Sequence, residues 1–161
     1  MFQKPPIEED PLDALMNRRQ TNFWAAVYAV GPAILLHELG HKFVAMYFGL
    51  EATFHAAYTF LALGVGLKLL NFPFIFFVPA YVTHPFTSAG QSAVISVMGP
   101  LVNLVLALGC WVAIKYHVVP HKYKMIAQIA VTVNFFLFIM NMLPIPGFDG
   151  FSFYVSIWQM F

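Results

Sequence analysis

Charge is what this sequence lacks most. Lys, Arg, Asp and Glu make up 9% of its 161 residues, against about a quarter in an average soluble domain. Eight basic and seven acidic residues leave a net charge of +1, so there is no basic field for holding a phosphate backbone, and we expect no nucleic-acid partner. The single cysteine, Cys110, has no partner in the chain, which excludes an intrachain disulfide and a thiolate metal cluster.

Apolar residues take the place of the missing charges. Hydrophobic residues make up 60% of the chain and aromatic residues 17%, and the mean hydropathy is +0.74. A chain of this length cannot hide so much apolar surface inside one globule, so lipid must be the solvent for most of it. The composition therefore predicts an integral, multi-pass membrane protein whose surroundings are the lipid bilayer.

Three apolar runs are long enough to be membrane-spanning helices: residues 22–49, 91–116 and 124–143. The first would extend about 42 Å as a helix, more than the roughly 30 Å hydrocarbon core. The other two form a helical hairpin. Residues 1–20 are predicted to be a polar N-terminal leader that precedes a membrane-embedded core over residues 21–161. The tail, residues 151–161, reaches only about 16 Å as a helix and cannot cross alone.

The segment between the first two spans is ambiguous. Tyr58–Leu70 is helical in character but short, and Phe74–Thr83 is rich in strand-forming residues. The segment is either a genuine crossing or a re-entrant element that returns to the side on which it began. Hydrophobic periodicity does not distinguish these two structures.

A metal-binding pattern lies inside the first predicted span. His37, Glu38 and His41 match H-E-x-x-H, in which two imidazoles four residues apart lie on one helical face and can bind one tetrahedral zinc, while the Glu reaches the water on that zinc. A charge near the middle of a membrane helix costs about 2.5 to 3.5 kcal/mol on insertion scales. We therefore interpret the cluster as functional. The alternative is a polar cluster that only hydrogen-bonds neighbouring helices.

A catalytic zinc usually takes three protein ligands, so a third ligand is needed. The acids beyond the leader are only Glu38, Glu51 and Asp149. Asp149 follows Pro144 and Pro146, which interrupt the last long helix, and such an interruption at membrane depth is tolerated where it lines a polar cavity. The alternative is a helix-ending loop at the membrane surface with a solvated Asp149.

The two patterns together resemble a known family. A membrane helix with H-E-x-x-H, followed by N-x-x-P-x-P-x-x-D-G over residues 141–150, is similar to the site-2 protease family of zinc intramembrane metalloproteases. The resemblance spans residues 31–150. Gly99 to Asn103 reads G-P-x-x-N, which resembles the middle helix of that family.

The resemblance implies a fold and a set of site residues. In that family the two His and the Asp bind Zn²⁺ and the Glu activates water, which here gives His37, His41 and Asp149 as metal ligands and Glu38 as the catalytic residue. Asp149 can meet the two imidazoles only if residues 51–90 begin and end on one side, which favours a re-entrant element or two short passes over a single crossing. The family has a β-hairpin at this position, so the fold class we predict is all-α, a polytopic bundle of three core spans plus a re-entrant helix and β-hairpin insertion.

The predicted strand Phe74–Thr83 has two interpretations. An edge strand would offer backbone partners to a substrate that has been unwound for cleavage, and Pro79 would limit that edge to part of its length. The alternative is an ordinary lipid-facing segment.

Two asparagines are candidates for supporting the reaction. Ser92, Ser96, Gly99 and Asn103 form a narrow small and polar stripe on one helix face. Asn103 on this stripe either binds substrate or stabilises the oxyanion, or joins packed helices by hydrogen bonds. Asn141 opens the motif that contains Asp149 and is the second candidate for substrate or ligand support, whereas Asn134 is interpreted as a helix-packing residue.

Two indications of orientation oppose each other. The resemblance implies a metal toward the cytosol. Basic residues lie at the ends of the spans opposite the metal. The positive-inside tendency would place these ends, and not the metal, at the cytosol. These residues are Arg18, Arg19, Lys115, Lys122 and Lys124.

The sequence thus predicts an intramembrane zinc endopeptidase that hydrolyses a peptide bond of a transmembrane protein or peptide substrate, with Glu38 as general base. The alternative is a catalytically inactive metal-binding membrane protein, either a scaffold for transmembrane clients or a zinc carrier. A carrier would need a file of polar ligands across the bilayer, and a scaffold would not need Glu38 beside His37.

Overall fold

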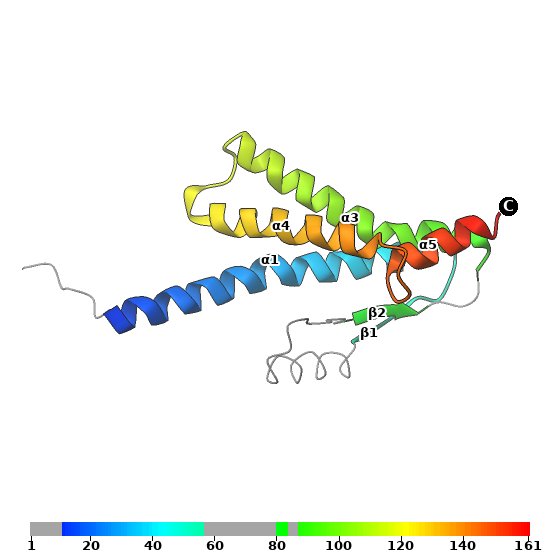
Figure 1. The fold of residues 1–161 in the computed structure, drawn as a ribbon, viewed down its shortest axis with the longest axis horizontal. Helices are drawn as coiled ribbons and strands as arrows, with labels where there is room; N and C mark the ends of the chain where they lie inside the picture. Colours follow the sequence, from blue (N-terminus) through cyan, green and yellow to red (C-terminus); the bar gives the residue numbers. More distant parts are fainter. Residues whose placement is uncertain (1–10, 57–79, 84–86) are drawn as a thin grey trace, which may run out of the picture.

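A computed structural model of the chain describes residues 11–56, 80–83 and 87–161 and shows a helical protein with one small sheet (Figure 1). The elements in chain order are α1 (Pro11–Tyr47), β1 (Thr53–Ala56), β2 (Ala80–Thr83), α3 (Ala89–Lys115), the 3-10 turn η1 (His121–Tyr123), α4 (Lys124–Asn141) and α5 (Asp149–Trp158). Helix α3 packs against α1, α4 and α5, so it is the central helix of the bundle.

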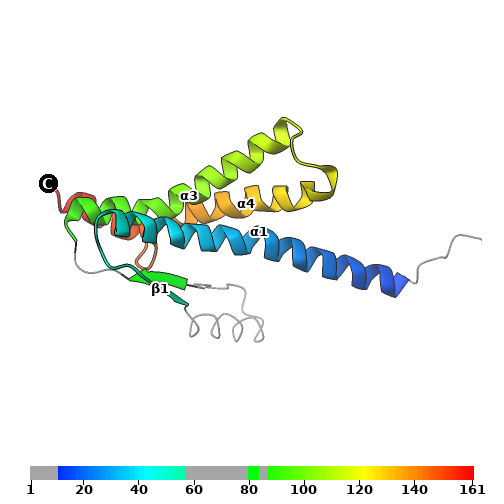
Figure 2. The same cartoon turned by 180° about the vertical axis from the view of Figure 1, so that it is seen from behind.

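Three of the helices are long and apolar enough to cross a membrane, as the sequence predicts: Phe23–Tyr47 within α1, Ala89–Lys115, and His121–Asn141. Helix α3 runs antiparallel to α1 and α4, and the turn between α3 and α4 lies at the same end as the start of α1 (Figures 1 and 2). The short α5 follows α4 and packs on α3 at the opposite end.

The bundle has small and polar residues inside and large apolar residues outside. The buried apolar residues are Ala25, Ala29, Ala33, Ala45, Ala93, Ile95 and Ala107, whereas the exposed residues include many Phe, Trp, Tyr, Leu and Val. Small residues let helix backbones approach closely in lipid, where large apolar side chains gain nothing from being hidden. This distribution supports the assignment of lipid as the solvent of the helices.

Helix α1 begins earlier than expected. The sequence places the start of the apolar run at Asn22, but the helix extends back to Pro11. Proline suits the first position of a helix because its missing N–H would have no intrahelical partner there. The intervening residues include no glycine and several strong helix formers, so the helix continues beyond the apolar run that predicts the span.

Helix α1 ends where the sequence predicts it. Gly49 has a φ of 75°, and the N–H of Leu50 donates to the carbonyl of Ala45 at 3.1 Å, which is the Schellman arrangement favoured by glycine. Helix α3 begins at the same end of the bundle at which α1 stops (Figures 1 and 2). The chain between them therefore makes no net crossing of the bundle.

A two-stranded sheet lies beside this end of α1. Strands β1 and β2 pair antiparallel, with Thr53 opposite Thr83 and Ala56 opposite Ala80. Strand β2 falls at the end of the predicted strand Phe74–Thr83, and β1 was not predicted. The rest of that strand and the predicted helix Tyr58–Leu70 lie outside the described residues.

Candidate metal centre

The two histidines of the H-E-x-x-H pattern belong to a buried row on α1. Ala25, Ala29, Ala33 and Ala45 are buried at intervals of four or multiples of four, and His37 and His41 fill the two positions between Ala33 and Ala45. Each histidine is only 7% exposed. Residues four apart share one helix face, so the packing of α1 against the bundle turns both imidazoles inward.

Close approach of α1 and α3 depends on Gly40, the residue between Leu39 and His41. A Cβ at Gly40 would lie 2.9 Å from the Val102 side chain and 3.2 Å from the Met98 carbonyl oxygen of α3. The missing side chain therefore lets the two helices meet beside the histidines.

Asp149 reaches the same place from the other end of the chain. Helix α4 stops at Asn141, the chain passes through a loop that contains Pro144 and Pro146, and α5 begins at Asp149. A Cβ at Gly150 would lie 2.5 to 2.8 Å from backbone atoms of Met142 and Leu143. Only glycine lets the start of α5 sit this close to the end of α4, and this contact places Asp149.

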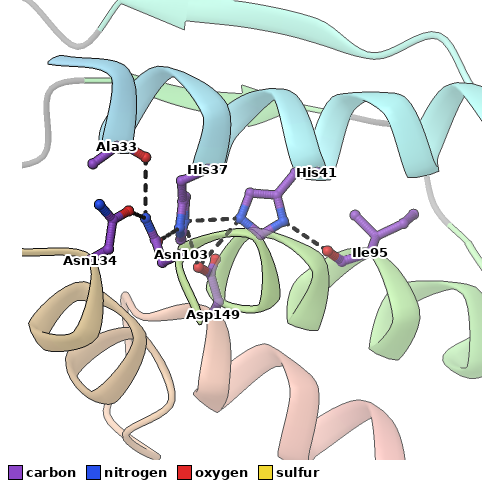
Figure 3. Close-up of polar contacts among 7 residues, drawn as sticks. All are labelled: Ala33, His37, His41, Ile95, Asn103, Asn134 and Asp149. Atoms are coloured by element: carbon purple, nitrogen blue, oxygen red, sulfur yellow. Dashed lines mark hydrogen bonds and ion pairs between the residues drawn. The ribbon is translucent and has the colours of Figure 1, made fainter. Parts of the chain in front are cut away.

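The His37, His41 and Asp149 side chains converge on one point (Figure 3). The Nε2 atoms of the two histidines are 3.2 Å apart, and Asp149 Oδ2 lies 3.0 Å from that of His37 and 3.3 Å from that of His41. Zinc binds nitrogen and oxygen at about 2.0–2.1 Å, so two of its ligand atoms in a tetrahedral site are separated by about 3.3–3.4 Å. The three atoms thus form a triangle of the size of one tetrahedral face.

Space for an ion beside this triangle is provided by Gly99 of α3. A Cβ built at Gly99 would overlap Nε2 of His41 and lie 2.7 Å from Nε2 of His37. Any side chain at position 99 would therefore occupy the place where the ligand atoms meet.

Hydrogen bonds fix which ring nitrogens face the cluster. His41 Nδ1 contacts the Ile95 carbonyl oxygen at 2.7 Å, and His37 Nδ1 contacts Asn103 Oδ1. Both partners are acceptors, so each neutral ring must carry its proton on Nδ1 and its lone pair on Nε2. Two lone pairs and a carboxylate oxygen face one another, and a cation satisfies all three.

The electrostatics of Asp149, which lies outside the three candidate spans, are consistent with an anion at this point. Burial alone would raise the pKa of its carboxyl, but hydrogen bonds and Coulomb attraction from His37 and His41 outweigh burial and lower the pKa to about 2. The Asp149 side chain keeps 27% of its exposure. The carboxylate at the start of α5 is thus partly accessible.

Glu38, the predicted catalytic residue, is half-buried next to the cluster. It interacts electrostatically with His37, His41 and Asp149. Its carboxylate makes no hydrogen bond to another residue of the described part of the chain, so it remains available to a bound water or substrate.

The two asparagine candidates differ in position. Asn103 is fully buried and bonded to His37 through Oδ1, while its Nδ2 donates to Ala33 O at 3.2 Å and to Asn134 Oδ1 at 2.9 Å. Both amide hydrogens are used, which leaves Asn103 no donor for a substrate oxyanion. Asn141, at the end of α4, makes no hydrogen bond to a described residue.

Sequence reasoning missed three features of the site. Ile95 acts through its carbonyl oxygen, for which residue type gives no signal. Asn134 is interpreted from the sequence as a helix-packing residue, and its residue type gives no signal for its hydrogen bond to Asn103. Gly99 appears in the G-P-x-x-N pattern and on the small-residue stripe, so a signal for it was present.

These residues suit zinc. The donor set is two neutral imidazoles and one carboxylate, which zinc accepts in catalytic sites that keep one position open. Among the described residues, His37, His41 and Asp149 are the one group of at least three metal-ligating side chains that meet at a point.

Comparison with known proteins agrees with this chemistry. No protein-family model matches the chain. The chain is 34% identical over 130 residues to a Methanocaldococcus jannaschii protein named "Putative zinc metalloprotease MJ0611", and the match covers 80% of this chain and 68% of the relative. The chain therefore belongs to the same family as this relative, whose name places it among the zinc metalloproteases.

Proposed function

We propose that the protein is an intramembrane zinc endopeptidase of the site-2 protease kind. The observation that carries the proposal is the triangle of His37 Nε2, His41 Nε2 and Asp149 Oδ2, which lies at a point where one helix able to cross a membrane meets a second, with Glu38 beside it. Three side chains able to bind a metal, with a carboxylate beside them, are the minimum that hydrolysis by a zinc peptidase requires.

The chain's own residues would divide the work of the reaction. His37, His41 and Asp149 would hold Zn²⁺, which when bound supplies Lewis-acid polarisation of a carbonyl and lowers the pKa of water toward about 7. The carboxylate of Glu38 would accept a proton from the attacking water. It would then pass this proton to the nitrogen of the cleaved bond as the amine leaves. One water is consumed for each peptide bond cleaved, and the products are a carboxylic acid and an amine.

The substrate class follows from the surroundings of the cluster. The helices that hold it present exposed Phe, Trp and Leu side chains to their surroundings, so a substrate reaching the site laterally arrives through lipid. We therefore assign a transmembrane protein or peptide as substrate. On the same proposal, the sheet of β1 and β2, which contacts α1, offers a strand edge that can pair with the extended substrate.

The assignment of Glu38 is tested by Glu38→Gln in the full chain, purified in detergent and supplied with a transmembrane peptide. The substitution removes the proton acceptor but none of the three metal ligands. We expect zinc content at the wild-type level and a loss of cleavage of about a hundredfold or more. Peptide cleavage by mass spectrometry and zinc by elemental analysis are the two readouts.

His37→Ala is the matched variant, because it removes a ligand and should lose zinc and cleavage together. Cleavage at the wild-type rate by Glu38→Gln would refute the assigned mechanism. Zinc bound by a wild-type chain that cleaves no transmembrane peptide would favour the inactive scaffold. Zinc transferred across a vesicle membrane would favour the carrier.

A further inference from the structure

A buried asparagine on α4, Asn134, is connected to the candidate metal centre through Asn103 and does not itself contact a proposed metal ligand. Asn134 is 3% exposed and is the buried residue of α4, whose other side chains are half-buried or exposed. Its Oδ1 accepts from Asn103 Nδ2 at 2.9 Å, and its Nδ2 donates to the carbonyl oxygen of Ala130 at 2.8 Å. Figure 3 shows Asn134 beside Asn103, on the side away from Asp149.

Backbone carbonyl groups accept hydrogen bonds and never donate them. They therefore fix the direction of each hydrogen bond in the series from Asn134 through Asn103 to His37. The Ala130 carbonyl holds the NH₂ group of Asn134, so the oxygen of Asn134 faces Asn103. That oxygen and the Ala33 carbonyl together hold the NH₂ group of Asn103. The oxygen of Asn103 therefore faces His37 Nδ1, which must carry the proton.

We propose that Asn134 is a positioning residue of the metal centre, which acts through Asn103 to keep the His37 ring in the tautomer that has its lone pair on Nε2. This inference rests on the proposed function in assigning a metal to His37. The inference goes beyond that function because it assigns a role in the metal centre to α4, whereas the proposed ligands lie on α1 and α5.

The physical consequence of losing Asn134 follows from the symmetry of a carboxamide. Without the Asn134 oxygen, one N–H of Asn103 has no acceptor in a buried site, where an unpaired donor is costly. Rotation of the carboxamide would turn its NH₂ toward His37 Nδ1. The ring would then place its lone pair on Nδ1 and its proton on Nε2, where a proton blocks metal binding.

A double-mutant cycle tests the proposal with zinc affinity as the readout, measured in the full detergent-solubilised chain by competition with a chromophoric chelator. Residues that orient a metal-binding histidine typically change metal affinity by about 10- to 100-fold when removed. We expect Asn103→Ala to fall within this range. Asn134→Ala should weaken affinity by about tenfold, because the Ala33 carbonyl still holds Asn103.

The cycle separates positioning from packing. Once Asn103 has been removed, Asn134 has nothing to act through, so adding Asn134→Ala to Asn103→Ala should change affinity by less than about twofold. Equal weakening by Asn134→Ala in both backgrounds would overturn the proposal, as would wild-type affinity in the single variant. Thr132→Ala is the control, since the Thr132 hydroxyl makes the same kind of bond to a carbonyl four residues back, at Gln128, but is exposed.

A second readout does not depend on zinc. The metal-free chain is labelled with nitrogen-15 at its histidine rings, and nitrogen NMR then distinguishes a protonated from an unprotonated ring nitrogen. The signal of His37 is identified by its absence from the spectrum of His37→Ala. We expect an unprotonated Nε2 in the wild-type neutral ring and a growing fraction of the other tautomer in Asn134→Ala. An unchanged tautomer in Asn134→Ala would overturn the proposal, whereas a wild-type chain that binds no zinc would overturn only the proposed function.

Discussion

At the scale of single residues, the metal centre depends as much on a missing side chain as on the ligands. Gly99 leaves open the point at which the two histidine Nε2 atoms and the Asp149 oxygen meet, because a Cβ there would overlap the His41 nitrogen. The atoms in conflict belong to buried rings whose other nitrogens are hydrogen-bonded, so the rings cannot turn aside without breaking those bonds.

Gly99→Ala is therefore expected to abolish zinc binding while the chain still folds. Alanine is a better helix former than glycine, so the loss should appear in metal content and not in helical content by circular dichroism. Gly109→Ala on the same helix is the control, because a Cβ at Gly109 meets nothing within 4 Å. Wild-type zinc content in Gly99→Ala would show that the ligands do not meet where the structure places them.

Much of the site at this scale could be predicted from residue types. Two histidines four apart and a carboxylate beside a helix interruption are rare enough in an apolar chain to be found by enumeration. The Ile95 carbonyl and the partner of Asn134 could not be predicted, because they depend on which faces of α1, α3 and α4 meet. That information lies in the packing and not in any one residue.

At the scale of elements, Asp149 is positioned by the way in which α4 ends and α5 begins. The two prolines predict the interruption, but the direction in which the chain turns back depends on Gly150, which packs on the backbone of Met142 and Leu143. A helix start placed elsewhere would leave the carboxylate out of reach of His37 and His41.

Gly150→Ala tests this placement. Backbone atoms cannot give way as a flexible side chain can, so the added Cβ should push the start of α5 away from α4 and displace the Asp149 carboxylate. We expect zinc affinity to fall by at least about tenfold. Displacing a metal ligand should weaken affinity more than removing a residue that only hydrogen-bonds a ligand. Gly31→Ala on α1, where a Cβ meets nothing within 4 Å, should keep wild-type affinity, and equal affinity in both variants would contradict this account.

The helices themselves were predictable from the apolar runs, to within a few residues at the ends of α3 and α4. The start of α1 was not, because helix propensity extends it through polar residues that the hydrophobic pattern excludes. Strand β1 was missed for a related reason: four residues carry too short a pattern, and pairing with β2 defines the strand.

At the scale of the whole molecule, the bundle brings together residues from distant parts of the sequence by returning the chain to one end. Helices α3 and α4 go across and back, and the segment before α3 makes no net crossing (Figures 1 and 2). This arrangement was predictable from the requirement that Asp149 meet His37. The three buried polar residues Asn103, His37 and Asn134 then join the three long helices into one hydrogen-bonded unit.

The central claim is that one zinc ion is held by two imidazoles and one carboxylate within this bundle. Zinc X-ray absorption of the purified full chain tests it most directly, because imidazole, oxygen and sulfur neighbours give distinct signals. We predict one zinc per chain with two imidazole ligands and the remaining ligands oxygen, at about 2.0–2.1 Å. A sulfur ligand, fewer than two imidazoles, or an unchanged spectrum in His41→Ala would contradict the account.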